Sequence, residues 1–233
     1  IVGFTRDFKA PSTLFTYPNG GTKPAEAVGA GNINPYLVDA VDVIVEQTRR
    51  PVFAALRPAA FGNMPRDDGN LVVEPDELDA VKTDPIAAKY LRRYVGSREL
   101  MHDRPRWCLW LVDATPGDLE NSPVLAARLQ GVREFRSASS AESTRGMAAT
   151  PQLFGQRAQP DVSYLCLPRV VSERRRFFTA AYFPPDVISS DAVFMAPDPD
   201  GIALAMVSST QFITWMKTIG GRLESRIRFS NTF

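Results

Sequence analysis

The sequence predicts a mixed α/β (α+β) domain in which a short-stranded mixed sheet is flanked by several helices. Nearly continuous apolar runs are typical of buried strands, and longer segments carry apolar residues at helical spacing. At the end of the chain, polar and apolar residues alternate as they do along a half-buried strand. The composition agrees with a globular domain, because 44% of the residues are hydrophobic and 23% are charged.

Chain length sets the expected domain organisation. With 233 residues, the chain has the length of one large domain or two small ones. We expect one domain over residues 1–233, and a soft subdomain boundary near residue 140 stays open. No apolar run approaches the ~18 residues of a membrane span, and the start has neither a signal peptide nor an initiator methionine. We therefore expect a piece of a longer protein, without a membrane partner.

Helices and strands alternate along the first half of the chain. The predicted elements are a strand at 1–4, a helix over 36–45 behind Asn34-Pro35, a strand at 52–56, a helix over 84–94 and a buried central strand at 106–112. Trp107 and Trp110 belong to this last strand. We expect both rings in the core, since apolar aromatic residues in such runs are usually buried.

The second half begins with a long helix over 123–138. Its apolar positions, including Phe135, are predicted to face the core, while Arg128, Arg133 and Arg136 face away. A small, polar loop follows, which we expect to be mobile or to cross the surface. The remaining elements are a buried strand over 163–171 interrupted at Pro168, strands at 177–183, 192–195 and 202–206, a helix over 210–219 capped by Ser208 or Ser209, and a strand over 222–229.

The last predicted strand has one mostly apolar face and one charged face. Residues that alternate along a strand share a face, so Arg222, Glu224, Arg226 and Arg228 are expected on the same side. Such a face is compatible with solvent exposure and cross-strand ion pairs. It is also compatible with contacts to DNA base edges, because arginine donates to guanine O6 and N7 while glutamate accepts from cytosine N4.

Charge does not by itself indicate a nucleic-acid partner. The formal net charge is +1, so the whole chain has no strong basic field. Arginine nevertheless accounts for 22 of the 27 basic residues. This preference suits planar, bidentate recognition of phosphate and guanine, and a GC-rich genome explains it equally well.

Histidine and cysteine usage argues against hydrolytic and metal-dependent chemistry. His102 is the single histidine and lies in a charged loop, so a triad or a histidine-ligated metal would depend on it alone. Cys108 and Cys166 lie in apolar runs and are expected to be free, buried thiols in a reducing cytoplasm. We predict no catalytic residue and no metal site. A stand-alone enzyme with its site at Arg66-Asp67-Asp68 or His102 is the alternative.

Four stretches together carry a resemblance to a known family. They are GNMPRDDGNLVV, RWCLWLVDATPGDLENSPVLAARLQGVREFR, QPDVSYLCLPRVVSERR and GRLESRIRFS. In this order and spacing they resemble the target-recognition domain of MmeI-type (type IIL) restriction-modification enzymes and related class I adenine-N6 DNA methyltransferases. The resemblance implies an excised recognition domain from a larger bacterial enzyme.

The methyltransferase signatures themselves are absent from the sequence. There is no Phe-x-Gly-x-Gly loop, and Asn34-Pro35-Tyr36 is only a truncated version of the Asn-Pro-Pro-Tyr motif that holds a flipped base. No cofactor is therefore expected in this chain. The resemblance implies that S-adenosylmethionine binds to an attached methyltransferase domain upstream in the same polypeptide.

The resemblance also implies which residues contact DNA bases. Glu224 and Arg226, with Ser225 between them, match a pair that specifies one base pair, and Arg228 with Ala192 match positions tied to a neighbouring one. Arg169 and Asp191 match a third pair, for which we expect guanine. In each charged pair the acid would hold the arginine in one rotamer, so that its fork addresses a base edge. A structural salt bridge is the alternative.

A different role is expected for the segment Ser172-Glu173-Arg174-Arg175. A hydroxyl group and consecutive arginines at the end of a strand suit contacts to phosphates, which position a duplex without specifying its sequence. Alternatively, one of these arginines pairs with Glu173 for structure. The predicted phosphate contacts are Ser172, Arg174 and Arg175.

Together these observations predict a module that recognises a specific sequence in duplex DNA through the major groove, while an attached domain methylates adenine. The chain alone would not be an enzyme. Besides the stand-alone enzyme, an arginine-rich domain that binds acidic proteins is an alternative.

Overall fold

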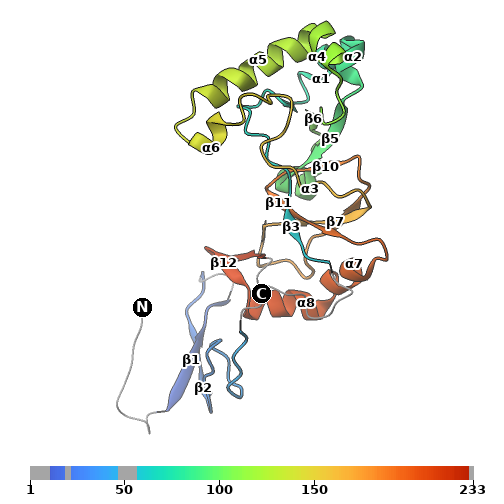
Figure 1. Ribbon diagram of the computed structural model, residues 1–233. Coiled ribbons are helices and arrows are strands. Elements are labelled where there is room, and N and C mark those ends of the chain that lie inside the picture. The colour runs from blue at the N-terminus through green and yellow to red at the C-terminus, as the bar shows by residue number, and fades with distance from the viewer. Residues whose placement is uncertain (1–10, 19–21, 47–56, 231–233) are drawn as a thin grey trace.

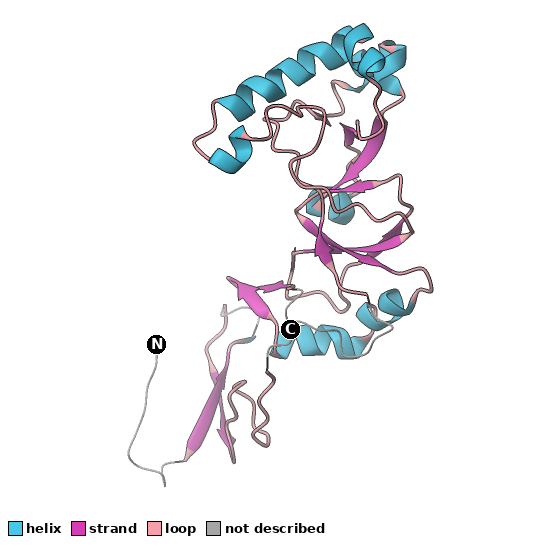
Figure 2. Ribbon diagram, viewed as in Figure 1, coloured by secondary structure: helices cyan, strands magenta, loops and turns pink. Residues whose placement is uncertain are grey.

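The computed structural model describes residues 11–18, 22–46 and 57–230. Figure 1 shows an elongated molecule, with α5 (Pro123–Ser137) and α6 (Glu142–Arg145) at one end and α7 (Ile202–Val207) and α8 (Thr210–Thr218) towards the other. Most of the strands occupy the region between these helices (Figure 2). This arrangement of short strands and helices confirms the predicted mixed α/β fold class.

One part of the molecule, which we call the helical lobe, is built on a four-stranded sheet. The order β10-β5-β6-β4 is antiparallel except for the parallel pair β10–β5. Its core includes Leu71, Leu125 and Phe154, and Trp107 and Trp110 pack against it, as predicted. The elements of this lobe besides α5 and α6 are β4 (Val72–Val73), α1 (Leu78–Thr83), α2 (Pro85–Ala88), β5 (Leu91–Val95), α3 (Ser97–His102), β6 (Trp107–Leu109), α4 (Pro116–Asn121) and β10 (Ile188–Ser189).

The other part, the sheet lobe, contains two small antiparallel sheets packed with α7 and α8. Their strand orders are β3-β11-β7-β9 and β12-β13-β8. Leu165, Phe194 and Ile227 belong to a core that joins the two sheets to α8. The strands are β3 (Ala60–Phe61), β7 (Tyr164–Pro168), β8 (Val170–Val171), β9 (Ala181–Phe183), β11 (Val193–Pro197), β12 (Gly221–Leu223) and β13 (Arg226–Arg228).

The long helix α5 confirms the predicted helix over 123–138 but not the direction of all its side chains. Ser122 caps it through a hydrogen bond from Leu125 N (3.0 Å), and Pro123 occupies its first turn. Arg136, expected to face away from the core, is fully buried, whereas Phe135 is exposed. The guanidinium is buried because backbone carbonyls surround it: it donates to those of Pro65, Arg66, Met147, Thr150 and Leu153.

The loop after α5 is consequently organised around the Arg136 side chain. Three of the five carbonyls that accept from it, those of Met147, Thr150 and Leu153, belong to this loop, which also forms α6. Most residues of this loop are exposed, so it crosses the surface, which was one of the two expectations for it.

Two predicted helices in the first half are wrong. The segment over 84–94 is helical only in α2 and continues as β5, because pairing with β6 and β10 outweighs the local helical pattern. No helix forms over 36–45 either. The Asn34 side chain accepts from the backbone N–H groups of Tyr36 (3.0 Å) and Val38 (3.3 Å), which offers the backbone a turn in place of a helix. The predicted strands at 1–4 and 52–56 lie outside the described residues.

Two predicted strands in the second half are also wrong. Residues 202–206 lie in α7, where the Asp198 carboxylate accepts from the N–H groups of Ala203 (2.9 Å) and Leu204 (3.0 Å). The strand over 222–229 is a hairpin, with β12 and β13 joined by Glu224 and Ser225. By contrast, α8 begins behind Ser209 and the strand break falls after Pro168, as predicted. The strands at 177–183 and 192–195 correspond to the shorter β9 and to β11.

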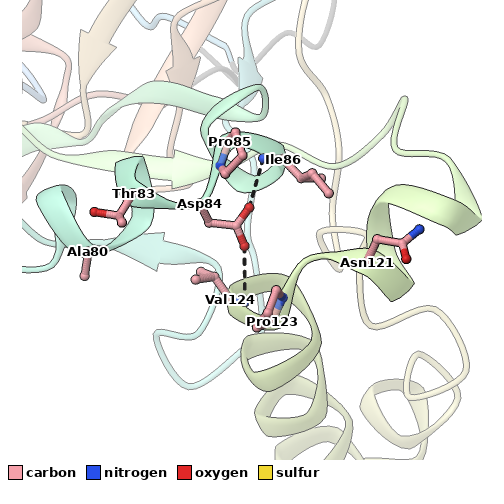
Figure 3. A pocket seen from close by; sticks show the side chains of 8 residues that line it. All are labelled: Ala80, Thr83, Asp84, Pro85, Ile86, Asn121, Pro123 and Val124. Carbon is pink, nitrogen blue, oxygen red and sulfur yellow. Dashed lines mark hydrogen bonds between the residues drawn. The ribbon is translucent and has the colours of Figure 1, made fainter.

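Asp84 connects two helices at the far end of the helical lobe. One carboxylate oxygen accepts from the N–H groups of Ile86 (2.9 Å) and Ala87 (3.0 Å) at the start of α2. The other accepts from Ser122 Oγ (2.5 Å) and Val124 N (3.4 Å) at the start of α5. The hydrogen bond from Ser122 is the main reason that the pKa of Asp84 is lowered. The pocket beside it (Figure 3) thus contains a carboxylate already occupied by helix capping.

Asp118 is expected to make this lobe sensitive to acid. Its carboxylate accepts from Thr115 Oγ1 (2.8 Å), Tyr90 Oη (2.8 Å) and Lys89 Nζ (3.1 Å). These bonds, the one from Thr115 above all, lower the pKa of Asp118 to about 2. Because the folded-state pKa is depressed, the stabilisation is complete above the ordinary value of about 3.9. It is lost as the pH falls through the folded-state value.

The corresponding experiment is a series of thermal melts between about pH 5 and about pH 2. We expect Asp118→Asn to melt below wild type at the upper end of this series and to converge with it at the lower end. Asp113→Asn, an exposed neighbour, is the matched control and should follow wild type throughout. A constant difference between Asp118→Asn and wild type across the series would contradict this role.

Candidate nucleic-acid interface

Strand pairing gathers several of the predicted base-contacting residues at one end of the β7–β11 ladder. Pro168 of β7 pairs with Val193 of β11, so Arg169 and Ala192 are the next residues on the two strands, with Asp191 beside them. Phe229 donates its N–H to the Arg169 carbonyl (2.9 Å). That bond brings the end of β13, and Arg228 with it, to the same place.

Arg169 is oriented by an aromatic ring and not by the predicted acidic partner. Its guanidinium carbon lies 5.0 Å from the centre of the Phe61 ring, a distance typical of cation–π stacking. Phe61 is itself stacked on Phe194, with ring centres 4.5 Å apart. Among the described residues, the Asp191 carboxylate makes no hydrogen bond or ion pair, so it does not hold Arg169 in its rotamer.

A small groove joins these residues to the hairpin. It has a volume of about 250 Å³ and exposes both Arg169 and Arg228 along its walls. The Arg228 side chain is exposed and has no ion pair within the part of the chain that the structure describes. Its lining residues are Phe61, Arg169, Phe194, Gly221, Arg228, Phe229 and Ser230.

The β12–β13 hairpin changes which arginines share a face. Arg226 and Arg228 flank the buried Ile227 on β13 and therefore point to the exposed side. Arg222 pairs with Ile227, so it lies on the other face, and it donates to the carbonyls of Lys217 (2.7 Å) and Ser225 (3.3 Å). The prediction that Arg222 belongs to the charged face is wrong, because the chain reverses after Leu223.

Glu224 and Arg226 form an ion pair at the tip of this hairpin. Arg226 Nη2 lies 2.9 Å from Glu224 Oε2, and their side chains are 48% and 77% exposed. Glu224 has a φ of 58°, a left-handed conformation that is unfavourable for a residue with a Cβ atom. The two-residue turn thus places the Glu224 carboxylate beside the Arg226 guanidinium. The two residues were predicted to be neighbours on one continuous strand, and the turn brings them together instead.

The predicted phosphate-contacting residues form a turn beside this hairpin. Val171 pairs with Ile227, so Ser172 follows next to Arg226. Ser172 accepts from Arg174 N through its hydroxyl (3.3 Å) and from Arg175 N through its carbonyl (3.2 Å). Within the described chain neither arginine pairs with Glu173, so their guanidinium groups are left available.

The segment that carries Asp191 and Ala192 is held by residues that the sequence did not single out. Asn63, which is fully buried, accepts from Asp191 N (3.0 Å) and donates to the Ser189 carbonyl through both its backbone N–H (2.7 Å) and its side chain (2.9 Å). Ser97 at the start of α3 donates its hydroxyl to the Ala192 carbonyl (2.6 Å).

This segment also requires a glycine opposite it and a protonated tyrosine beside it. A Cβ atom on Gly62 would lie 2.1 Å from the Ser190 carbonyl oxygen. Tyr164 donates to the Val187 carbonyl (2.5 Å) and contacts Ser189 Oγ (2.9 Å). Burial raises the pKa of Tyr164 to about 12, so its hydroxyl stays protonated at neutral pH. These bonds join residues that are far apart in the sequence, so no local pattern indicates them.

Comparison with known proteins identifies the family. Residues 39–233 match the MmeI target recognition domain. The chain belongs to this family. The domain is similar to the solved structure of the type IIL restriction-modification enzyme MmeI in complex with DNA, with a TM-score of 0.85 and 38% identity over 95% of this chain and 29% of that one. It is also 30% identical over 208 residues to DNA methyltransferase A of Bacillus subtilis (strain 168).

The MmeI-type domain thus corresponds to only a fraction of the length of its relatives. The match to DNA methyltransferase A covers 87% of this chain and 24% of that protein, so the chain spans about a quarter of the relative's length. Across residues 11–18, 22–46 and 57–230, no helix has the length and apolar character needed to cross a bilayer.

Two residues of the alternative enzyme site at Arg66-Asp67-Asp68 have structural roles in this MmeI-type domain. Asp67 is buried and accepts from Leu71 N (2.5 Å), which closes a turn, and Arg66 donates to Thr144 Oγ1 (3.1 Å). Cys108 and Cys166 are free and buried, as predicted; burial raises the pKa of the Cys166 thiol to about 12. The described residues contain no cluster of three or more histidine, cysteine or acidic side chains suited to a metal.

Proposed function

We propose that this domain recognises a specific sequence in duplex DNA through the major groove, as the recognition module of a larger bacterial adenine-N6 methyltransferase or restriction-modification enzyme in the cytoplasm. The observation that carries the proposal is a row of exposed and half-buried charged side chains along one side of the sheet lobe. Arg169 and Arg228 line one groove, and the Glu224–Arg226 pair and the Ser172–Arg175 turn continue the row. The similarity to MmeI, solved in complex with DNA, supports it.

The chemistry of the row supports two kinds of contact. A guanidinium fixed over an aromatic ring, as Arg169 is over Phe61, presents its fork in one orientation and suits guanine O6 and N7. The Asp191 carboxylate near it would repel a base that presents an acceptor at that position. Arg174 and Arg175 have no partner of their own among the described residues and suit phosphates, which fix the position of the duplex.

In this proposal, adenine methylation is carried out by the rest of the polypeptide. The domain supplies no catalytic residue and does not bind S-adenosylmethionine, which an attached methyltransferase domain would hold. The direct test is competition between duplexes selected from a random library and unselected duplex, combined with calorimetry on S-adenosylmethionine. Equal affinity for all duplexes would contradict sequence recognition, and so would preferential binding of acidic proteins. Stoichiometric binding of S-adenosylmethionine to the domain would contradict the assignment of cofactor binding to the attached methyltransferase domain.

Arg174 and Arg175 should contribute affinity without contributing specificity. We expect Arg174→Ala and Arg175→Ala each to weaken binding to all duplexes alike and to reduce the slope of log affinity against log salt by about 1, because each phosphate contact releases counterions. Titrations of a specific and a random duplex at several salt concentrations measure both quantities. Arg133→Ala, an exposed arginine on α5, is the control that should leave the slope unchanged. A changed sequence preference would assign these arginines to base contacts instead.

Ser97 should affect specificity without contacting DNA. Removing its hydroxyl releases the Ala192 carbonyl, so we expect Ser97→Ala to reduce discrimination at the base pair next to Asp191 and Ala192 by about 0.5–1.5 kcal/mol, the value of a typical hydrogen bond. Affinity for random duplex should stay close to wild type, and the melting temperature should fall by only a few degrees, as expected for the loss of one hydrogen bond. Ser97→Thr, which keeps the hydroxyl, should restore discrimination. Full discrimination in Ser97→Ala would show that this bond has no role in recognition.

A further inference from the structure

The N-terminal arm, which we define as described residues 11–18 and 22–46, exposes an unusual amount of apolar surface. It contains a hairpin of β1 (Ser12–Thr16) and β2 (Glu26–Ala30), in which no residue is buried. The rest of the arm is irregular and mostly exposed, although Asn34 is buried. Its exposed large apolar side chains are Phe15, Tyr17, Val28, Leu37, Val38, Val41, Val43 and Ile44, with Leu37, Val41 and Ile44 each more than 70% exposed.

The β1–β2 hairpin has no third strand within the described residues. It forms a two-stranded sheet of its own and extends beyond α8 and β12, away from the other sheets (Figure 1). A two-stranded hairpin without a packed face is at best marginally stable in water. Contiguous apolar patches on a protein surface mark interaction sites. The arm therefore has the properties of an element that is completed by something packed on it.

The base of the arm lies beside the sheet lobe and leaves its outer side open. Tyr36 Oη accepts from Val45 N (2.6 Å), which folds this stretch back on itself. Tyr36 and Val43 line a pocket of about 450 Å³ together with Trp215 of α8, so this stretch lies beside that helix. Trp215 is 44% exposed at this place. The open apolar surface is thus continuous from the arm onto α8.

The charge of the arm excludes DNA as the natural occupant of this surface. Residues 11–46 contain no arginine, although the whole chain has 22. Their charged residues are Lys23, Glu26, Asp39, Asp42 and Glu46, for a formal charge of −3. A surface that is apolar and acidic repels phosphates. Its partner is therefore a protein surface that is apolar and carries no excess of acidic groups.

We propose that the N-terminal arm, with Trp215 of α8, is the surface on which the remainder of the polypeptide docks. The two relatives supply the argument for this occupant, because the region similar to this chain makes up only 24% of DNA methyltransferase A and 29% of MmeI. In a protein of that build, most of the chain lies outside the recognition domain and is tethered to it. The proposal rests on the proposed function only for the existence of this longer polypeptide.

Hydrogen exchange compares the full-length polypeptide with the 233-residue chain. We expect the amides of 36–46 to exchange about 10-fold or more slowly in the full-length protein, because docking removes the local opening that limits protection. The amides of α5 should exchange alike in both, which provides an internal control. Equal exchange of 36–46 in the two proteins would overturn the proposal. This measurement needs no substitution.

A pair of substitutions tests the same surface. In the full-length protein, Val41→Asp with Ile44→Asp should abolish the protection of 36–46, whereas Val112→Asp, an exposed valine of the helical lobe, should not. In the 233-residue chain the double variant should keep the melting temperature and the affinity for duplex DNA. Unfolding of that chain, weaker DNA binding, or the conversion of a dimer of the chain into a monomer would each overturn the proposal. They would indicate an internal core, DNA or a second copy as the occupant.

The two proposals fail in different experiments. Loss of sequence preference in the duplex competition contradicts the proposed function and leaves the exchange of 36–46 untouched. Equal exchange in the two proteins contradicts the docking surface while the duplex preference stays.

Discussion

Replacing Arg136 by lysine should destabilise the domain more than any change at its surface. The buried guanidinium donates five hydrogen bonds to backbone carbonyls, at 2.7–3.0 Å, so all its N–H groups are used. A lysine has at most three donors and no planar fork, so at least two of these hydrogen bonds are lost, although the carbonyls of Pro65, Met147 and Thr150 each keep a backbone N–H donor. At about 1.5–3 kcal/mol for each lost hydrogen bond to a charged group, we expect the free energy of unfolding to fall by about 3–6 kcal/mol.

Urea denaturation measures this loss directly. Arg133→Lys is the matched control, since Arg133 is exposed on the same helix and donates only to Gln130. We expect it to lie within about 0.5 kcal/mol of wild type. A loss below about 1 kcal/mol for Arg136→Lys would mean that the loop after α5 rearranges to satisfy its carbonyls without the guanidinium, contrary to the role of Arg136 as its organiser.

Exchanging the charges of Glu224 and Arg226 should reverse the preference at one base pair. The pair lies at the hairpin tip with 2.9 Å between its charged groups, and Glu224→Lys with Arg226→Asp keeps an ion pair while exchanging donor and acceptor. Acidic groups accept from cytosine N4 and basic groups donate to guanine O6 and N7. We therefore expect the opposite orientation of a G·C pair to be preferred, by about 1–3 kcal/mol.

Selection from a randomised duplex library identifies the preferred base at each position. Affinity for random duplex should stay close to wild type, because Arg174 and Arg175, the proposed phosphate contacts, are unchanged. Glu224→Gln is the control: it removes the charge while keeping the side chain's size and its left-handed backbone. We expect it to weaken the preference without reversing it. An unchanged motif in the double variant would mean that the ion pair only stabilises the hairpin.

The elements that the sequence predicted well have local causes. Ser122-Pro123 and Ser209 mark the starts of α5 and α8 because their hydroxyls cap the first turn. Pro168 ends β7 where the chain changes from one sheet to another. By the same reasoning, Asp198 before Gly201 indicates the start of α7, because its carboxylate caps the first turn. The apolar run that follows was instead interpreted as a strand.

The predictions that failed were decided by contacts between distant residues. β5 is a strand because β6 and β10 pair with it on both sides, which no local pattern contains. Arg136 looked like a surface residue because its acceptors are carbonyls, which leave no mark in the sequence. In the candidate interface, the sequence predicted the residues that match the family's motifs. It did not predict Phe61, Asn63 or Ser97, because only the folded chain brings them to Arg169 and to Asp191–Ala192.

The parallel pair β10–β5 has a consequence for the order in which the two lobes form. During synthesis, β4, β5 and β6 can pair as soon as residues up to 109 have emerged, but β10 is residues 188–189. The outer edge of β5 thus stays unpaired while the next part of the chain is made, and open strand edges favour wrong pairings. β3 likewise waits for β11. The helical lobe is therefore completed only when the segment bearing Asp191 and Ala192 has been made, and a ribosome-bound chain ending before residue 188 would lack a finished sheet in either lobe.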